Sequence, residues 1–217
     1  MRPTFSGILP FLLVYAFFAC ETATTSTQRP LFDGQSFEGW EGDTLDTWRI
    51  AEGMILGGSL LETVPHNDFL VTEREYGDFI LTLKIKLSGE EGFINSGVQF
   101  HSQRLADPPY EMTGYQADWG QGYWASLYDE SRRNKTLAAP DSAQIMDWIK
   151  IGDWNDYKIH AENGRIQLFI NGHQTVDYTE RDAGIPQLGR IGIQIHGGGK
   201  AQVAVKDLWI EELSGGR

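Results

Sequence analysis

The chain has 217 residues and a formal net charge of −12 at pH 7, with 18 lysines and arginines against 30 aspartates and glutamates. Nucleic acids and anionic membrane surfaces are bound through clustered basic side chains, so this balance argues against both as partners. It is compatible with neutral ligands, cations and sugars. The length suits a single globular domain behind an N-terminal leader.

The first 20 residues predict export. Arg2 supplies a positive charge, and the apolar run Ile8–Ala19 is too short to span a bilayer but is typical of a signal-peptide core. Cys20, the only cysteine of the chain, follows small Ala19 and resembles the lipid-modification site of bacterial lipoproteins. The alternative is an ordinary signal peptide that is cut near Ala19 or Ala23.

The chain after this leader divides into a tether and one domain. We expect residues 1–19 to be the signal peptide, 20–30 a lipoprotein-type tether and 31–213 a single domain. The domain has no cysteine, so it must be held together by core burial rather than by disulfides. The expected location is the periplasm or the outer membrane, with membrane contact only through a lipid on Cys20.

Alternation of apolar and polar residues predicts strands along most of the chain. A three-stranded meander is predicted over Trp154–Asp177, because Asn163-Gly164 and Asn171-Gly172 separate alternating runs and suit type I′ turns. In chain order, the other expected strands are Trp48–Leu56, Phe69–Val71, Asp78–Leu87, Ile94–His101, Gly114–Trp119, Tyr123–Leu127, Arg190–His196 and Val203–Glu212.

Two local features complete the predicted elements. Asp141–Ile149 is the only helical pattern, with Asp141 as its expected N-cap. Asp207 is expected to mark a bulge, since the apolar parity changes there within the last strand. About ten short strands and 25 glycines in one domain predict an all-β, two-sheet antiparallel sandwich.

Strand parity predicts one polar sheet face. Polar side chains that oppose an apolar set occur in three strands: Asn95, Gln99 and His101; Gln116 and Asp118; and Arg190, Gln194 and His196. Exposed strand faces usually carry lysine, glutamate and threonine, whereas amides, carboxylates and imidazoles suit the hydroxyls of a ligand. The alternative is that these positions simply face solvent.

Aromatic residues cluster in and around the second of these strands: Tyr110, Tyr115, Trp119, Tyr123, Trp124 and Tyr128. Aromatic faces pack against sugar rings while neighbouring polar groups bind hydroxyls. The alternative is that two or three of them are core anchors. The adjoining segment Tyr128–Arg133 brings acids and arginines to the same region, or else forms a loop that is closed by its own ion pairs.

Several catalytic patterns are missing from the sequence. It has no H-E-x-x-H, no G-x-S-x-G and no EF-hand loop. The nearest string to the E-x-D-x-x-E of sandwich glucanases is Glu41–Asp46, which ends in aspartate and precedes a strand. Ordinary two-carboxylate glycoside hydrolysis is therefore disfavoured.

An ordered series of motifs runs from about Leu31 to Leu213. These are Leu31-Phe32-Asp33-Gly34, Gly39-Trp40, Trp48-Arg49-Ile50, Glu52-Gly53-Met54-Ile55, Tyr76-Gly77-Asp78-Phe79, Asn95-Ser96-Gly97-Val98, Trp154-Asn155-Asp156-Tyr157, Asn171-Gly172 and Ile191–Gly197. Together they resemble the 3-keto-disaccharide hydrolase domain family. The resemblance implies a concanavalin A-like jelly roll, often carried by exported bacterial lipoproteins, that cleaves glycosides whose sugar is oxidised to a ketone at C3.

The implied chemistry starts from the acidity that a C3 ketone confers on the C2 hydrogen. A base removes this proton, the C1 aglycone leaves by elimination and water adds afterwards, which requires a base, an enolate stabiliser and an acid. Our hypothesis assigns His101 or Asp118 as base and Glu130 or Tyr128 as proton donor. His196 and Arg132 would stabilise the enolate.

Substrate contacts are expected from a larger set: Asn95, Gln99, Tyr115, Gln116, Trp119, Trp124, Arg132 and Gln194. The sequence departs from the family at His101, where many members have arginine, and at Gln116, where many have glutamate. A base or metal ligand supplied by that glutamate would have to come from another group here, such as Asp118 or Glu130. No cofactor is certain, and a divalent cation held by His, Asp and Gln is left open.

A second class of function fits the same patterns. The Trp154–Tyr178 meander resembles those of laminin G-like and lectin sandwiches equally well, and a fold alone does not assign an activity. The alternative to an enzyme is therefore a non-catalytic glycan-binding module.

Overall fold

The computed structural model describes Met1 and residues 27–213. Residues 2–19 of the predicted signal peptide, Cys20 and most of the predicted tether lie outside the described residues. Within the described part of the chain, no helix is long and apolar enough to cross a membrane.

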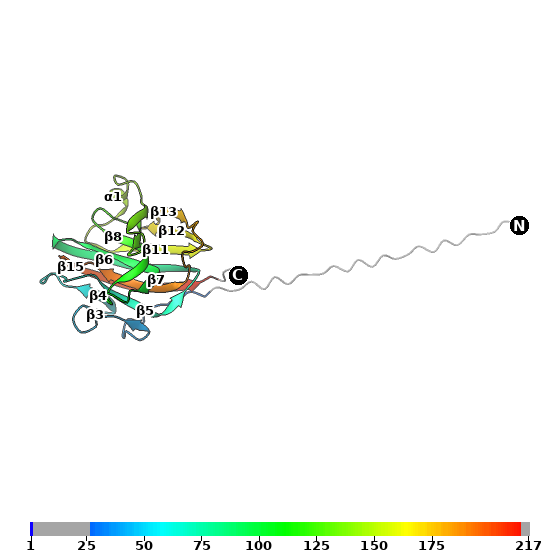
Figure 1. Ribbon diagram of the computed structural model, residues 1–217. Coiled ribbons are helices and arrows are strands. Elements are labelled where there is room, and N and C mark those ends of the chain that lie inside the picture. The colour runs from blue at the N-terminus through cyan, green and yellow to red at the C-terminus, as the bar shows by residue number, and fades with distance from the viewer. Residues whose placement is uncertain (2–26, 214–217) are drawn as a thin grey trace.

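Two antiparallel sheets make up the molecule (Figure 1). The eight-stranded sheet has the order β13-β12-β11-β6-β15-β4-β3, with β1 also paired to β15, and the seven-stranded sheet has the order β10-β9-β8-β7-β14-β5-β2. The strands are β1 Arg29–Pro30, β2 Trp40–Glu41, β3 Trp48–Ala51, β4 Met54–Gly58, β5 Asp68–Tyr76, β6 Phe79–Gly92, β7 Asn95–Arg104, β8 Met112–Gly120, β9 Leu127–Glu130, β10 Lys135–Ala138, β11 Asn155–Glu162, β12 Arg165–Ile170, β13 His173–Thr179, β14 Gly189–Ile195 and β15 Gly199–Glu212. This confirms the predicted all-β, jelly-roll sandwich.

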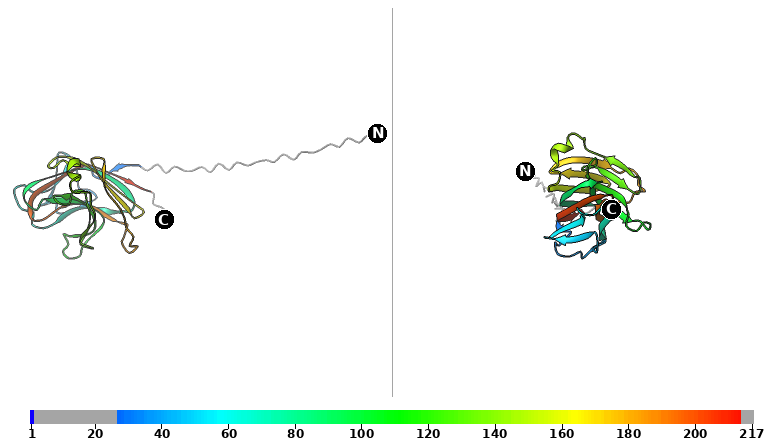
Figure 2. Two further views of the ribbon diagram at one scale, coloured as in Figure 1. Left: turned by 90° about the horizontal axis from the view of Figure 1, so that it is seen from above. Right: turned by 90° about the vertical axis from the view of Figure 1, so that its left-hand side faces the viewer.

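Strand pairing begins nearer to the N-terminus than the sequence predicted. β1 pairs with β15 at Ile210 and Trp209, so sheet structure begins inside the segment that the sequence assigned to the tether. Figure 2 shows β1 beside the end of β15.

The predicted meander is confirmed as β11, β12 and β13. Asn163 and Gly164 have φ values of 50° and 76°, and Asn171 and Gly172 have 48° and 85°, as type I′ turns require. The predicted bulge at Asp207 is also confirmed by a register shift between Lys206 and Trp209.

Two predicted strands are wrong. Trp48–Leu56 is not one strand but the hairpin of β3 and β4, because Glu52 and Gly53 have φ values of 52° and 73° and reverse the chain. Tyr123–Leu127 is mostly a turn, and β9 begins only at Leu127.

The predicted helix over Asp141–Ile149 is shorter than expected. α1 covers Ile145–Trp148 and lies at the outer edge of the molecule (Figure 1). Asp141 Oδ1 accepts the backbone N–H groups of Ala143 and Gln144 at 3.0 and 2.9 Å, so it caps the turn that leads into the helix rather than the helix itself.

The main core lies between the two sheets. In β6 the alternation is regular, with Phe79, Leu81, Leu83, Ile85 and Leu87 buried. Burying such side chains stabilises the fold by roughly 1.5–3 kcal/mol each, so a core of this size holds the domain without disulfides. The opposite face of the seven-stranded sheet carries the polar residues described next.

Candidate active site

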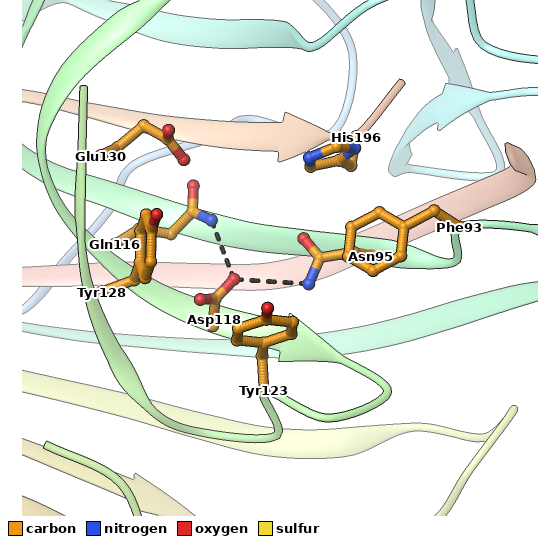
Figure 3. A pocket seen from close by; sticks show the side chains of 8 residues that line it. All are labelled: Phe93, Asn95, Gln116, Asp118, Tyr123, Tyr128, Glu130 and His196. Carbon is orange, nitrogen blue, oxygen red and sulfur yellow. Dashed lines mark hydrogen bonds between the residues drawn. The ribbon is translucent and has the colours of Figure 1, made fainter. Parts of the chain in front are cut away.

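A pocket of about 120 Å³ opens on the outer face of the seven-stranded sheet, the face turned away from the main core. Figure 3 shows the side chains that line it: Phe93, Asn95, Gln116, Asp118, Tyr123, Tyr128, Glu130 and His196. They come from β7, β8 and β9, from the residue that follows β14, and from two turns. We refer to this pocket as the polar pocket.

The floor of the polar pocket is set by strand register. β7 pairs with β8 on one side and with β14 on the other, so that Gln99 lies opposite Gln116, and Gly97 lies between Asp118 and Gln194. Side chains from three strands separated by up to about a hundred residues therefore meet on one face, as strand parity predicted.

A directed chain of hydrogen bonds crosses this floor. Ser102 Oγ donates to Gln99 Oε1 at 2.7 Å, and Gln99 Nε2 donates to Gln116 Oε1 at 2.9 Å. Gln116 Nε2 then donates to Asp118 Oδ1 at 2.9 Å and to Gln194 Oε1 at 3.1 Å. The oxygen of each glutamine amide accepts from the preceding residue of this chain, so its N–H group donates to the following one. The chain therefore ends on the carboxylate of Asp118.

Glycine makes room for this chain. A Cβ at Gly97 would lie 2.8 Å from the Gln116 side chain, and a Cβ at Gly120 would lie 2.6 Å from Asn95 Nδ2. With a larger residue in place of either glycine, the neighbouring side-chain amide could not lie flat across the sheet. The glycine of the Asn95-Ser96-Gly97 motif is thus required by the close approach of Gln116.

Asp118 lies at the end of the chain and is only 3% exposed. Its Oδ1 also accepts from Asn95 Nδ2 at 3.5 Å, whereas its Oδ2 accepts no hydrogen bond from the described residues. Burial raises the pKa of Asp118 to about 7, because the hydrogen bonds from Gln116 and Asn95 only partly offset the loss of water, and the charge of Glu130 adds to the rise.

The second carboxyl group of the pocket, that of Glu130, also has a raised pKa. Burial raises the pKa of Glu130 to about 7, with further contributions from the charges of Glu111 and Asp129. The pKa of the neighbouring Tyr128 is also raised, first by burial and then by Glu130 and Asp118. The polar pocket therefore holds two carboxyl groups that exchange protons near neutral pH, which is where general acid–base groups work best.

His196 faces these acids from the end of β14 (Figure 3). Its Nδ1 lies 2.7 Å from the carbonyl oxygen of Gly197. Since a carbonyl oxygen only accepts, Nδ1 is the donor in this hydrogen bond, which leaves Nε2 directed to the pocket. The ring packs edge-on against Phe93, with centroids 4.6 Å apart, and this contact fixes its orientation.

The rim of the polar pocket is aromatic. Phe93 and Tyr123 are each 39% exposed and pack edge to face, with centroids 6.4 Å apart. Exposed ring surface above a floor of hydrogen-bonding groups is the arrangement that suits a sugar ring, which has apolar C–H faces and a polar edge.

The structure corrects the predicted position of His101. A register shift between Phe100 and Gln103 makes β7 bulge, and His101 takes a φ of 44°. Its ring turns away from Gln99 and packs edge-on against Phe79, while Nε2 lies 2.8 Å from the carbonyl oxygen of Gly77. Burial lowers the pKa of His101, so the ring is a neutral core side chain.

Tyr115 and Trp119 were wrongly placed on the ligand side. They are 0% and 1% exposed and lie on the core face of β8, opposite in parity to Gln116 and Asp118. The alternative interpretation, that part of the aromatic cluster anchors the core, is the correct one for these two residues.

Arg132 also lies away from the polar pocket. Its guanidinium pairs with Asp129 at 2.8 Å and sits over the Tyr115 ring, 4.6 Å from the centroid. Arg133 pairs with Asp129 and with Glu180, to which the Tyr115 hydroxyl donates at 2.7 Å. The segment after Tyr128 is thus closed by its own ion pairs.

The other predicted site residues divide into three groups. The structure brings Asn95, Gln116, Asp118, Tyr128, Glu130 and His196 together around the polar pocket. Gln99 and Gln194 are 0% exposed and lie beneath it, in the hydrogen-bonded floor. Trp124 lies in a neighbouring hollow, where it packs edge-on against Trp119 with centroids 4.8 Å apart.

Two pocket residues, Phe93 and Tyr123, were not among the site residues predicted from the sequence. Phe93 has the same parity as Asn95, two residues before it, and extending the alternation by one step would have indicated it. Tyr123 belonged to the aromatic cluster, but the turn that carries it was interpreted as a strand.

Metal binding has no clear donor set here. Among residues 27–213, no group of three or more His, Cys, Asp or Glu side chains is arranged to hold a metal ion. The divalent cation that the sequence left open stays a prediction.

The fold and this face define a concanavalin A-like jelly roll with an acidic, amide-rich pocket on the outer face of one sheet. A family model for the 3-keto-alpha-glucoside-1,2-lyase-like domain matches residues 27–211. The chain belongs to this family, which confirms the resemblance found in its motifs. No curated protein matches the chain in sequence.

Solved structures share the fold. A protein from Parabacteroides distasonis, provisionally named a glycosyl hydrolase, is 20% identical with a TM-score of 0.64, covering 86% of this chain and 94% of the other. The carbohydrate-binding module CBM66 from Bacillus subtilis is 15% identical with a TM-score of 0.62, over 80% and 96%. A Bacillus licheniformis β-glucanase is 10% identical with a TM-score of 0.53, over 87% and 98%. At these identities the likeness concerns the fold.

Proposed function

We propose that this protein is an enzyme that cleaves glycosides whose sugar carries a ketone at C3, with the sugar ring bound in the polar pocket. The observation that carries the proposal is the meeting of Asp118, Glu130 and His196 in one small pocket with an aromatic rim. The family to which the chain belongs supports the same substrate class.

Asp118 is the proposed base. Its free Oδ2 takes the C2 proton, and the electrons of the C2–H bond move to the C3 oxygen as an enolate. The amides of Gln116 and Asn95 hold Oδ1 and so orient the carboxylate. Burial makes this carboxylate a stronger base than an ordinary one, as abstraction of a weakly acidic carbon-bound proton requires.

Glu130 is the proposed acid. The enolate electrons return to form a C1=C2 double bond, the C1–O bond breaks, and protonated Glu130 gives its proton to the departing oxygen. Water then adds at C1 and C2 is reprotonated, so that glycoside and water become the free 3-keto-sugar and an alcohol. His196 lines the same pocket and is placed to interact with the developing enolate.

Aglycone release from a 3-keto-glucoside tests this proposal. Purified protein should release the aglycone from the ketone and leave the unoxidised glucoside intact. Asp118→Asn should lower kcat by about a hundredfold or more, in keeping with the contribution of general-base catalysis. Release that is equally fast from the unoxidised glucoside would contradict the mechanism, because that substrate has no acidic C2 hydrogen.

A matched control distinguishes catalysis from folding. Asp156 lies in β11 of the eight-stranded sheet and does not line the polar pocket, and its side chain is 67% exposed. Asp156→Asn removes a carboxylate in the same way but should leave kcat unchanged. Circular dichroism of both variants should match that of the unmodified protein.

A non-catalytic glycan-binding module remains the second candidate. It is favoured by the aromatic rim of Phe93 and Tyr123 and by the likeness to CBM66. Such a module should bind an unoxidised oligosaccharide, measured by calorimetry, and leave the 3-keto-glucoside intact. The raised pKa of Asp118 and of Glu130 favours the enzyme, because a binding site gains nothing from acids that are half-protonated at neutral pH.

A further inference from the structure

A second and larger hollow of about 500 Å³ lies beside the polar pocket. It is formed by the turn between β8 and β9 and by the segment that carries α1. Its lining residues are Gln121, Gly122, Tyr123, Trp124, Ser126, Thr136, Ala139, Pro140, Ser142, Ile145, Met146 and Ile151. Tyr123 also lines the polar pocket, so one aromatic ring separates the two spaces.

The two spaces differ in chemistry. The polar pocket presents Asp118, Glu130 and His196, whereas none of the twelve described residues that line the second hollow is charged. A second sugar ring would need several hydrogen-bonding partners for its hydroxyls. This lining has the polar side chains of Gln121, Ser126, Thr136 and Ser142, of which Ser126 already donates to a backbone carbonyl, and the rest of it is mainly ring and aliphatic surface.

Part of that apolar surface is exposed to solvent. Met146 is 47% exposed and Ile151 is 63% exposed, and both lie at this hollow. Trp124 is held in place from below by Trp119, at an interplanar angle of 71°. A fixed aromatic ring with uncovered apolar neighbours is a surface that favours a flat apolar group.

Backbone hydrogen bonds connect the turn that lines the second hollow to Asp118, the proposed base. The backbone N–H of Asp118 donates to the carbonyl of Ser126 at 2.9 Å, and the N–H of Ala125 donates to the carbonyl of Asp118 at 3.0 Å. Ser126 Oγ donates to the carbonyl of Tyr123 at 2.9 Å. The turn that separates the two spaces is therefore held at a set distance from the carboxylate that is proposed to act at C2.

We infer that the second hollow is the aglycone site, and that it selects 3-keto-glycosides whose aglycone carries an aromatic ring. The inference rests on the proposed function and names its substrate class. With the sugar in the polar pocket, the C1 oxygen passes beside Tyr123 and the aromatic ring packs on Trp124 and against Met146 and Ile151.

A pair of substrates with matched leaving groups tests the inference. 2-Phenylethyl and ethyl 3-keto-glucoside both release a primary alcohol, so their difference in kcat/KM reports the phenyl ring rather than the ease of C–O cleavage. We expect kcat/KM to be at least tenfold higher for the phenylethyl compound. A 3-keto-disaccharide serves as the third substrate.

The double variant Met146→Ser, Ile151→Ser reduces apolar contact at two partly exposed positions, where the risk to folding is small. The phenylethyl-to-ethyl ratio should fall to about threefold or less. Leu61→Ser is the matched control: Leu61 is 85% exposed and does not line either space, so the ratio should be unchanged. Trp124→Ala should also lower the ratio, with its folding checked by circular dichroism.

Failure of this inference is distinguishable from failure of the proposed function. Equal kcat/KM for the phenylethyl and ethyl compounds would overturn the aglycone site while leaving the enzyme in place. A clear preference for the 3-keto-disaccharide over both would overturn the aromatic occupant in favour of a second sugar. Absence of turnover with all three ketones would overturn the proposed function and this inference together.

Discussion

Replacing Asp118 by asparagine should make the protein more stable while it removes the proposed base. Burial raises the pKa of this carboxyl from its ordinary 3.8 to about 7. A difference of about three pH units corresponds to roughly 4 kcal/mol of unfavourable free energy for holding the charged form in the folded state. Asparagine keeps an oxygen that can accept from Gln116 and Asn95 but adds an N–H group without an assigned partner, which costs about 1–2 kcal/mol.

The raised pKa of Asp118 in the folded state determines at which pH values Asp118→Asn is the more stable protein. Below pH 3.8 the group is protonated in the folded and unfolded states, so its ionisation contributes nothing to stability. Between about pH 4 and 7 only the unfolded state ionises readily, and the unmodified protein loses stability that Asp118→Asn retains. Above about pH 7 the difference is constant, and we expect the variant to be about 2 kcal/mol more stable.

Urea denaturation at pH 4 and at pH 8 measures this difference directly. Asp156→Asn, which removes an exposed carboxylate, serves as the control and should show little change between the two pH values. A variant that is less stable than the unmodified protein at pH 8 would refute the reasoning, because it would mean that the buried charge of Asp118 is well compensated. A more stable and inactive variant is what a functional carboxylate in a dehydrated site should give.

The other predictions concern activity, packing and location. The profile of kcat/KM against pH should be bell-shaped around pH 7, since Asp118 must be ionised and Glu130 protonated; a flat profile from pH 5 to 9 would refute these roles. Gly97→Ala should displace Gln116 and lower kcat/KM about tenfold, because the added Cβ would lie 2.8 Å from that side chain; an unchanged value would show that the amide chain does not orient the base. Cys20→Ser should move the protein from the membrane fraction to the soluble fraction of the cell, and retention in the membrane fraction would refute the lipid anchor.

The polar face could be predicted from alternation because each strand has a period of two residues. Asn95 and Gln99, Gln116 and Asp118, and Gln194 each lie opposite an apolar set, and the structure places all five on one sheet face. The same parity argued that Tyr115 lies on the core side. The density of aromatic residues predicted the ligand side for Tyr115 instead, and it was the weaker signal.

His101 and Arg132 could not be placed from alternation. A bulge adds one residue to a strand and turns the following side chains over, and nothing in the composition of β7 marks the residue at which this happens. The position of the Arg132 guanidinium depends on which acid it pairs with, and that acid is Asp129, three residues before it. Local ion pairs of this kind compete with a ligand, and only the folded structure decides between them.

The sequence by itself determined the two-sheet fold, the Asn-Gly turns and the side chains that share a face within one strand, because these follow from short-range backbone geometry. The tertiary structure decided which strands are neighbours, and so brought Asp118, Glu130 and His196 into one pocket. It also decided how much water each acid loses. Since the pKa of a carboxyl group depends on that burial, the proposed chemistry of the site belongs to the folded protein and not to any segment of its sequence.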